Sequence, residues 1–359
     1  MPATHFINKP LNTFAGEVVI SGTAYRFPEA LNVEQYSQRL FNLKSELITK
    51  PLINYEFDYE FYGISREMAE KMTLESKYFI ESTYDCIVDA GLLPFELKGS
   101  NTGFFIATSE TEEYKLNLYR EYISTIFNFK GPIEFFHQYS SSFFALDASY
   151  RSIASGKCDQ AIVTGIDLLT GLPTVGCVFV QKRDVCKRFY AKVLASKLYQ
   201  GLEYIDAEKL REFYTQWNID PTLVTYVENF GQMSRGIEEY KTLAKIFAPE
   251  TIERSLPVYF GSVQRMSAYE GLPCGINALI KMIISIQAGI IPASYEKPDW
   301  IISKDAKFVQ TNSKFYGGLM ALNSFDGIWN SHIVLQPNTD CLMSKLGKNI
   351  IFVNLCESF

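Results

Sequence analysis

Histidines and cysteines are the residues of this chain best suited to acid–base or nucleophilic chemistry, and they are few. The three histidines are His5, His137 and His332. An imidazole can move a proton near neutral pH, and a cysteine thiolate can carry a thioester. The cysteines are scattered and form no Cys-x-x-Cys pair, so we expect no zinc site, no disulfide framework and a reducing compartment. The seven cysteines are Cys86, Cys158, Cys177, Cys186, Cys274, Cys341 and Cys356.

Two arrangements of these residues could form a nucleophilic site. Ser140 follows His137 by three residues, as in an imagined acyl hydrolase, but Ser140 to Ser142 also suit the capping of a helix. A Ser–His pair further needs an orienting acid and a shaped oxyanion hole. Cys274 could be a relocated nucleophile, although an unpaired cysteine is commonly a small core residue. We expect structural roles for all of them.

The elements that must position these residues alternate along the chain. Strands are expected at 17–21, 103–108, 131–138, 160–164, 177–181, 190–196, 224–228, 257–261 and 331–336, and helices at 33–43, 74–90, 140–155, 237–247 and 274–288, with one more after Asp206. This alternation predicts a layered α/β fold. The segments 143–153 and 275–286 are apolar almost all round, so these two helices must lie between layers.

Composition excludes several classes of protein. The 359 residues include 47% hydrophobic and 21% charged residues, so bulk disorder is excluded and one two-lobed unit or two domains are expected. A net charge of −6 without a basic stripe argues against nucleic-acid binding. The apolar stretch 278–293 contains Lys281 and is too short to span a membrane. We therefore expect a cytoplasmic protein without cofactor or metal.

Six blocks of sequence, in this order, carry a family resemblance. They are 17–28 (EVVISGTAYRFP), 68–108, 140–165, 227–231 (VENFG), 261–281 and 323–338 (NSFDGIWNSHIVLQPN). The chain resembles the ketosynthase, or beta-ketoacyl synthase, domain of animal fatty acid synthase, and its insect versions most of all. The resemblance implies a thiolase-like five-layer αβαβα sandwich of two similar halves, usually a homodimer. We expect halves at 15–189 and 190–338 and a C-terminal tail at 339–359.

The resemblance also implies a chemistry, a decarboxylating Claisen condensation. In the family, a cysteine at a helix N-terminus takes the acyl chain, because the helix end favours the thiolate. Two histidines then hydrogen-bond the thioester oxygen on which negative charge develops, and a lysine supports them. The related form that decarboxylates without condensing replaces the cysteine by glutamine and keeps both histidines.

This chain changes every one of those positions. The cysteine position is Tyr139, a phenol and a poor acyl acceptor at neutral pH. The two histidine positions are Phe230 and Tyr269, and the lysine position is Gln264. The family's Gly-Phe-Gly-Gly loop is replaced by residues 326–329, which end in a bulky tryptophan. The resemblance therefore predicts neither condensation nor decarboxylation.

Three functions follow as expectations. The first is a catalytically degenerate ketosynthase-like protein that acts as a structural or interaction module in a homodimer or heterodimer. The second is an acyl-chain or hydrophobic-ligand binding protein, and the third a residual acyltransferase of fatty acid biosynthesis. The residues expected to line a ligand or acyl pocket are Phe135, Phe136, His137, Tyr139, Ser140, Phe143, Phe144, Phe230, Tyr269, Phe325 and Trp329.

Overall fold

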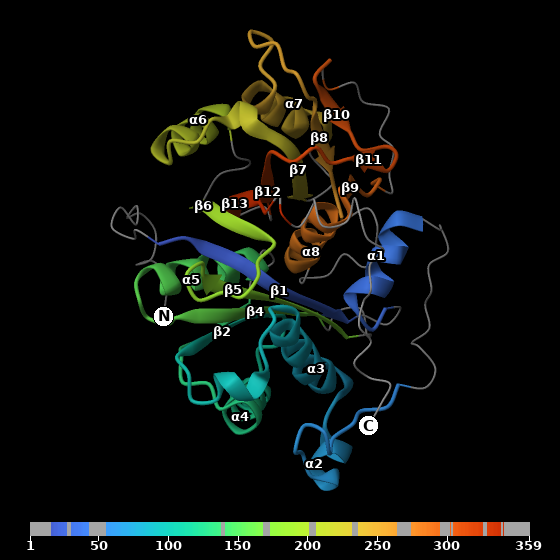
Figure 1. Cartoon of the computed structure of the whole chain (residues 1–359), viewed down its shortest axis with the longest axis vertical. Helices are drawn as coiled ribbons and strands as arrows, with labels where there is room; N and C mark the ends of the chain where they lie inside the picture. The colour runs from blue at the N-terminus through green and yellow to red at the C-terminus, as the bar shows by residue number, and fades with distance from the viewer. Residues whose placement is uncertain are drawn as a thin grey trace.

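The computed structural model describes most of the chain. The described residues are 16–26, 30–42, 55–137, 141–167, 173–200, 206–231, 236–263, 274–294, 302, 304–325, 329–338 and 340. Helices cover both outer faces of a long mixed sheet and also fill a central layer (Figure 1). The predicted five-layer sandwich is confirmed by this arrangement.

The N-terminal half contributes five neighbouring strands. Their order in the sheet is β3 (Ile133–Phe136), β2 (Thr102–Thr108), β4 (Gln160–Asp167), β5 (Thr174–Lys182) and β1 (Val18–Arg26). β3, β2 and β4 run parallel, whereas β5 is antiparallel to both β4 and β1. β3 therefore forms one edge of the whole sheet.

The C-terminal half repeats this pairing pattern. Its strands are, in order, β10 (Ala306–Phe308), β8 (Val258–Gly261), β7 (Val224–Gly231), β12 (Leu319–Phe325), β13 (Trp329–Pro337) and β6 (Ala191–Gln200). β8, β7 and β12 run parallel, and β13 is antiparallel to both β12 and β6. The two halves join where residues 18–20 of β1 pair with residues 191–193 of β6. This repeat agrees with the expected two similar halves, while the boundary at residue 189 stays a prediction.

Helices divide the core into three apolar clusters. The first lies around the central helices α5 (Ser141–Ala154) and α8 (Cys274–Ala288), and α1 (Val33–Asn42) also packs there. The second lies under α3 (Leu74–Asp89) and α4 (Glu113–Tyr122), and the third under α6 (Ala207–Gln216) and α7 (Gly236–Phe247). The two helices expected between layers are therefore in the central layer.

Short elements complete the described structure. They are α2 (Arg66–Lys71), η1 (Pro94–Leu97), η2 (Ile123–Phe127), η3 (Pro221–Leu223) and a two-stranded sheet of β9 (Ile290–Ile291) and β11 (Ser313–Lys314). No helix in the described ranges is long and apolar enough to cross a membrane.

Local sequence explains where several helices begin and end. The Asp206 side chain accepts a hydrogen bond from the Lys209 backbone N at 2.7 Å and caps α6, as the sequence predicts. Gly91 follows α3 with a φ of +80°, a conformation that suits glycine at a helix end. At the end of α3, Asp89 accepts hydrogen bonds from Thr23 N and Tyr190 OH, both at 2.7 Å, which tie the helix to β1 and to the residue that precedes β6.

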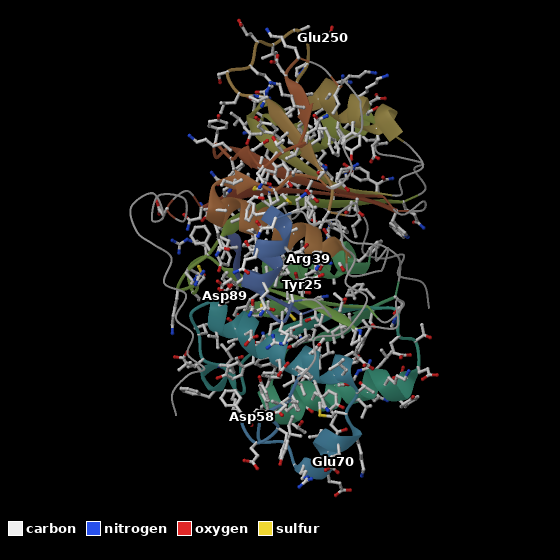
Figure 2. The ribbon with its side chains drawn as sticks, turned by 90° about the vertical axis from the view of Figure 1, so that its right-hand side faces the viewer. Tyr25, Arg39, Asp58, Glu70, Asp89 and Glu250 are labelled. Atoms are coloured by element: carbon white, nitrogen blue, oxygen red, sulfur yellow. The ribbon has the colours of Figure 1, made fainter. Side chains whose placement is uncertain are left out.

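Asp89 lies near the middle of the molecule in the side view (Figure 2). Glu250, beyond α7, and Glu70, in α2, lie at its opposite ends in the same view. The molecule is therefore elongated in the direction in which the layers are stacked, with the central helices halfway along it (Figure 1).

Candidate functional site

The candidate site lies where three parallel strands, β7, β8 and β12, have their C-terminal ends side by side. Glu228 of β7 pairs with Gly261 of β8, and Gly231 pairs with Phe325 of β12. Phe230 is the penultimate residue of β7 and lies opposite Ser324. Because parallel strands end at the same edge, the segments that follow β7, β8 and β12 all start there.

The structure does not describe the side chains of several predicted site residues. Tyr139, Ser140, Gln264 and Tyr269 lie outside the described residues. The backbones of Phe230 and Phe325 are in strands, but their side chains lie outside the description. The structure therefore places the strand ends of this site, and not the side chains at the family's catalytic positions.

The first turns of the two central helices touch. A Cβ at Gly275 of α8 would lie 2.7 Å from Cε2 of Phe143 and 2.9 Å from Cβ of Ser142. Real Cβ atoms essentially never approach so closely, so α5 and α8 approach this closely only because residue 275 is glycine. Ser142 and Phe143 are both buried at this junction, at 2% and 1% exposure.

An aromatic pair joins α5 to the start of β13. The Phe144 and Trp329 rings lie 4.9 Å apart, at 86° to each other. Such an edge-to-face pair is favourable because the positive ring edge meets the negative ring face. Both side chains are half-buried. The predicted pocket residues Phe144 and Trp329 are thus brought together.

The structure separates other members of the predicted pocket. Phe136 packs with Phe143 against the central cluster, whereas Phe135 packs on the opposite face of β3 with the α3–α4 cluster. The reason is the alternation of side chains along a strand. Phe135 therefore does not share the space around Phe143, which corrects the expectation of one common lining. His137 is exposed, and its ring stacks with the Phe135 ring at 6.4 Å.

A buried ionic cluster joins β7 to α8 near the strand ends. It was not predicted from the sequence. Lys281 Nζ donates to Glu228 Oε2 at 2.8 Å, and both side chains are fully buried. Tyr226 OH donates to the same oxygen, and burial, followed by the charge of Glu228, raises the tyrosine pKa. A Cβ at Gly261 would lie 2.9 Å from Glu228 Oε2, so only glycine fits beside the cluster. The only sign of this cluster in the sequence is one charged residue in the mainly apolar β7 and one in the mainly apolar α8.

His332 belongs to the core. Its Nε2 lies 3.0 Å from Tyr214 OH, and burial lowers the imidazole pKa to about 3. The ring is therefore neutral at ordinary pH. It packs edge-to-face on Phe213 at 4.9 Å. This agrees with a scaffold role.

The described cysteines are poor nucleophiles. Cys86, Cys158 and Cys177 are buried and free. Burial raises the pKa of Cys158 to about 11 and that of Cys177 to about 12, so both stay thiols at neutral pH. Within the described part of the chain, no group of three or more His, Cys, Asp or Glu residues could hold a metal ion.

Comparison with known proteins relates the chain to one family of enzymes. The family model described as Beta-ketoacyl synthase, N-terminal domain, matches residues 49–124 and 121–189. The chain is 24% identical to the fatty acid synthase of Anser anser anser over 353 residues, 76% of this chain and 99% of that sequence. It is 25% identical to the polyketide synthase PksR of Bacillus subtilis over 83% of its length, but spans only 15% of that protein.

Solved structures share the fold. A Streptomyces albus oxazolomycin ketosynthase domain, OzmH KS8, superposes with a TM-score of 0.76 at 21% identity, over 90% of this chain and 96% of that one. The ketosynthase from module 6 of the Bacillus subtilis bacillaene synthase superposes with a TM-score of 0.75 at 18% identity, over 90% and 72% of the two chains. The layered sandwich described above is thus the ketosynthase, thiolase-like fold.

Proposed function

From the premise that the chain is a homologue of the ketosynthases of fatty acid and polyketide synthases, we propose that it does not condense acyl groups and acts as a dimerising structural protein. The function rests on the fold and on what the chain carries at the strand and helix ends where the family performs its chemistry. Fold alone does not fix function, because the residues at the site decide which chemistry is possible.

The main support for this proposal is that histidine and cysteine are absent from the segments where the condensation would need them. No histidine occurs between His137 and His332, so β7, β8 and the segments after them contain none. No cysteine occurs between Cys86 and Cys158, so none lies in the segment that leads into α5. The condensation needs a thiolate at that helix end and two hydrogen-bond donors on the thioester oxygen.

The two histidines that the structure describes do not take the place of the family's catalytic pair. His332 is buried against Tyr214 and neutral. His137 follows the edge strand β3, and its ring stacks on Phe135, on the face turned away from the central helices. The described residues thus offer no second pair of imidazoles beside the strand ends. These placements favour a protein whose scaffold is kept for assembly.

The open sheet edge supports the dimerising role. Among the described strands, β3 pairs only with β2, so no described strand lies along its outer edge. An exposed strand edge is a template for another chain unless something covers it. We propose that a partner, in a homodimer or a heterodimer, covers this edge. The free cysteines support a cytoplasmic location for the assembly.

A condensation assay tests the proposal. The purified chain is incubated with a malonyl thioester and an acyl thioester, and the beta-ketoacyl product is measured by mass spectrometry. We expect no product above the protein-free control, while an active ketosynthase in the same assay supplies the positive control. Product formation that scales with the concentration of this chain would overturn the proposal.

The second candidate is the binding of an acyl chain or another hydrophobic ligand. It is favoured by the half-buried Phe144–Trp329 pair, which lies beside the first turn of α5. Its test is binding of a fluorescent fatty acid to the wild type and to Trp329→Ala, with Tyr316→Ala, a change at an exposed aromatic residue, as the matched control. A change confined to Trp329→Ala supports ligand binding there, and no binding to any of the three proteins rules it out.

A further inference from the structure

We propose that one side of the protein binds the surface of a membrane that contains anionic lipids. The binding surface is a basic–apolar patch made of two neighbouring segments. They are residues 92–98, which follow α3 and include η1, and residues 182–188, which lead from the end of β5 toward β6. The inference goes beyond the structural role proposed above and does not depend on whether the chain condenses acyl groups.

The two segments of the patch touch each other. Lys187 Nζ lies 3.5 Å from Glu96 Oε2. A Cβ at Gly91, which leads into the first segment, would lie 3.6 Å from Cβ of Lys187 and 3.8 Å from Cγ of Arg188. The start of the first segment therefore packs directly on the second, and the patch is one continuous surface.

The patch lies at the opposite ends of the strands from the candidate site. Lys182 pairs with Val18 at the start of β1, and Ala191 pairs with Pro337 at the end of β13. β13 is antiparallel to β12, so its end lies beside the start of β12, and β7 runs parallel to β12. Asp89, the last residue of α3, lies on the left-hand side of the molecule in the side view (Figure 2). Binding through the patch therefore leaves the C-terminal ends of β7, β8 and β12 uncovered.

Three large apolar side chains of the patch are exposed to solvent. Phe95 is 66% exposed, Val185 53% and Leu93 45%. Leu93 and Phe95 belong to the short η1 and its N-cap, and Val185 belongs to the turn between β5 and β6. Apolar side chains of a peripheral protein enter the boundary between lipid headgroups and acyl chains. Moving these three side chains out of water there favours binding.

Exposed cations surround the apolar side chains. The exposed charged residues of the patch are the cations Lys98, Arg183, Lys187 and Arg188 and the carboxylates Glu96 and Asp184. They give the surface a net charge of +2, although the whole chain carries −6. The Lys187–Glu96 and Arg188–Asp89 pairs are both 3.5 Å long and partly exposed, and such pairs are weak. The cations are therefore available to lipid headgroups.

This combination favours a membrane over an acidic protein as the partner. A bilayer with anionic lipids places negative headgroups directly above an apolar layer, and the patch presents cations around apolar side chains. An acidic peptide satisfies the cations alone. The rest of the chain carries a net negative charge, so the same lipids repel it and the patch is the side that faces them.

Co-sedimentation with vesicles tests the proposal. The purified chain is mixed with phosphatidylcholine vesicles that contain about 30 mol% phosphatidylserine, or none. We expect binding to the anionic vesicles alone, and weaker binding at higher salt. Arg183→Gln with Lys187→Gln should weaken it about tenfold or more, because each cation near the surface contributes to the attraction.

The matched control removes the same charge from another surface. Arg66 and Lys71 of α2 have side chains that are 77% and 74% exposed. Arg66→Gln with Lys71→Gln should leave the affinity for anionic vesicles within about twofold of the wild type, because these cations lie outside the patch. Circular dichroism shows that each variant is folded.

A fluorescent reporter tests the insertion of the apolar side chains. Phe95→Trp places an indole at the most exposed of them, and its emission, relative to the wild type, should shift to the blue when anionic vesicles are added. Tyr114→Trp, at an aromatic residue of α4 that is 63% exposed, is the matched control and should show no shift.

Three results would overturn the proposal. The first is a wild type that stays in the supernatant with both kinds of vesicle. The second is an equal loss of binding in the patch variant and the α2 variant. The third is binding to poly-glutamate, but not to vesicles, that is lost in Arg183→Gln with Lys187→Gln, because this would assign the patch to an acidic protein.

Discussion

Lys281 of α8 and Glu228 of β7 form an ion pair inside the protein, with Nζ 2.8 Å from Oε2 and neither side chain exposed to solvent. The pair links the central helix to the strand that ends at the candidate site. Two charges taken out of water cost several kcal/mol each, and their mutual attraction compensates only when the geometry is good.

Removing one partner of this pair should be costly. Lys281→Met leaves the Glu228 carboxylate buried without its cation, and we expect the free energy of unfolding to fall by about 3–5 kcal/mol. The double variant Lys281→Met with Glu228→Gln removes both charges and should be less destabilised than Lys281→Met alone. Urea unfolding measures both. A single variant as stable as the wild type would show that the pair does not hold α8 to β7.

Stability should fall in acid because of His332. Burial lowers its folded-state pKa to about 3, against an ordinary value of 6.5, so the unfolded chain takes up the proton first as the pH falls. The contribution is fully present above pH 6.5 and is lost between pH 6.5 and 3, at about 1.4 kcal/mol per pH unit. His332→Gln should show a shallower fall over this range in urea unfolding at a series of pH values. Equal slopes would contradict the assignment.

Arg254 should hold together three segments of the C-terminal half. Its guanidinium donates to the carbonyl oxygens of Leu256 and Val224 at 2.9 and 2.8 Å, and also to those of Thr222 and Phe247. Arg254→Met leaves those carbonyls without their donor, and we expect a loss of about 2–3 kcal/mol.

The matched control for this change is Arg66→Met, because the Arg66 side chain is 77% exposed and its ion pair, with Glu70, lies within α2. Its loss should stay within about 0.5 kcal/mol. Thermal unfolding followed by circular dichroism compares the two variants. Equal shifts in melting temperature would show that the four carbonyl contacts contribute little.

Local patterns in the sequence were sufficient for much of the fold. The apolar character of α5 and α8 placed both helices between layers, and Asp206 marked the start of α6. α2 and α4 were not expected, because their exposed faces carry many charges and their apolar stripes are narrow. A strand was expected at β13 and none at β12, although the two are antiparallel neighbours in the sheet.

The site was less predictable because it depends on contacts between distant residues. Nothing near Glu228 in the sequence names Lys281, which lies 53 residues away, as its partner. Phe135 and Phe136 are both among the residues expected to line one pocket, but neighbours in a strand face opposite layers. The Phe144–Trp329 contact needs α5 and β13 to be brought together, which only the tertiary fold does.

Native mass spectrometry after incubation with an acyl thioester and a malonyl thioester tests the central claim most directly. We expect a dimer with twice the 40.9 kDa chain mass, no acyl group bound covalently and no condensed product in the solution. A chain that carries a covalent acyl group, together with a beta-ketoacyl product, would show a working nucleophile and contradict the account.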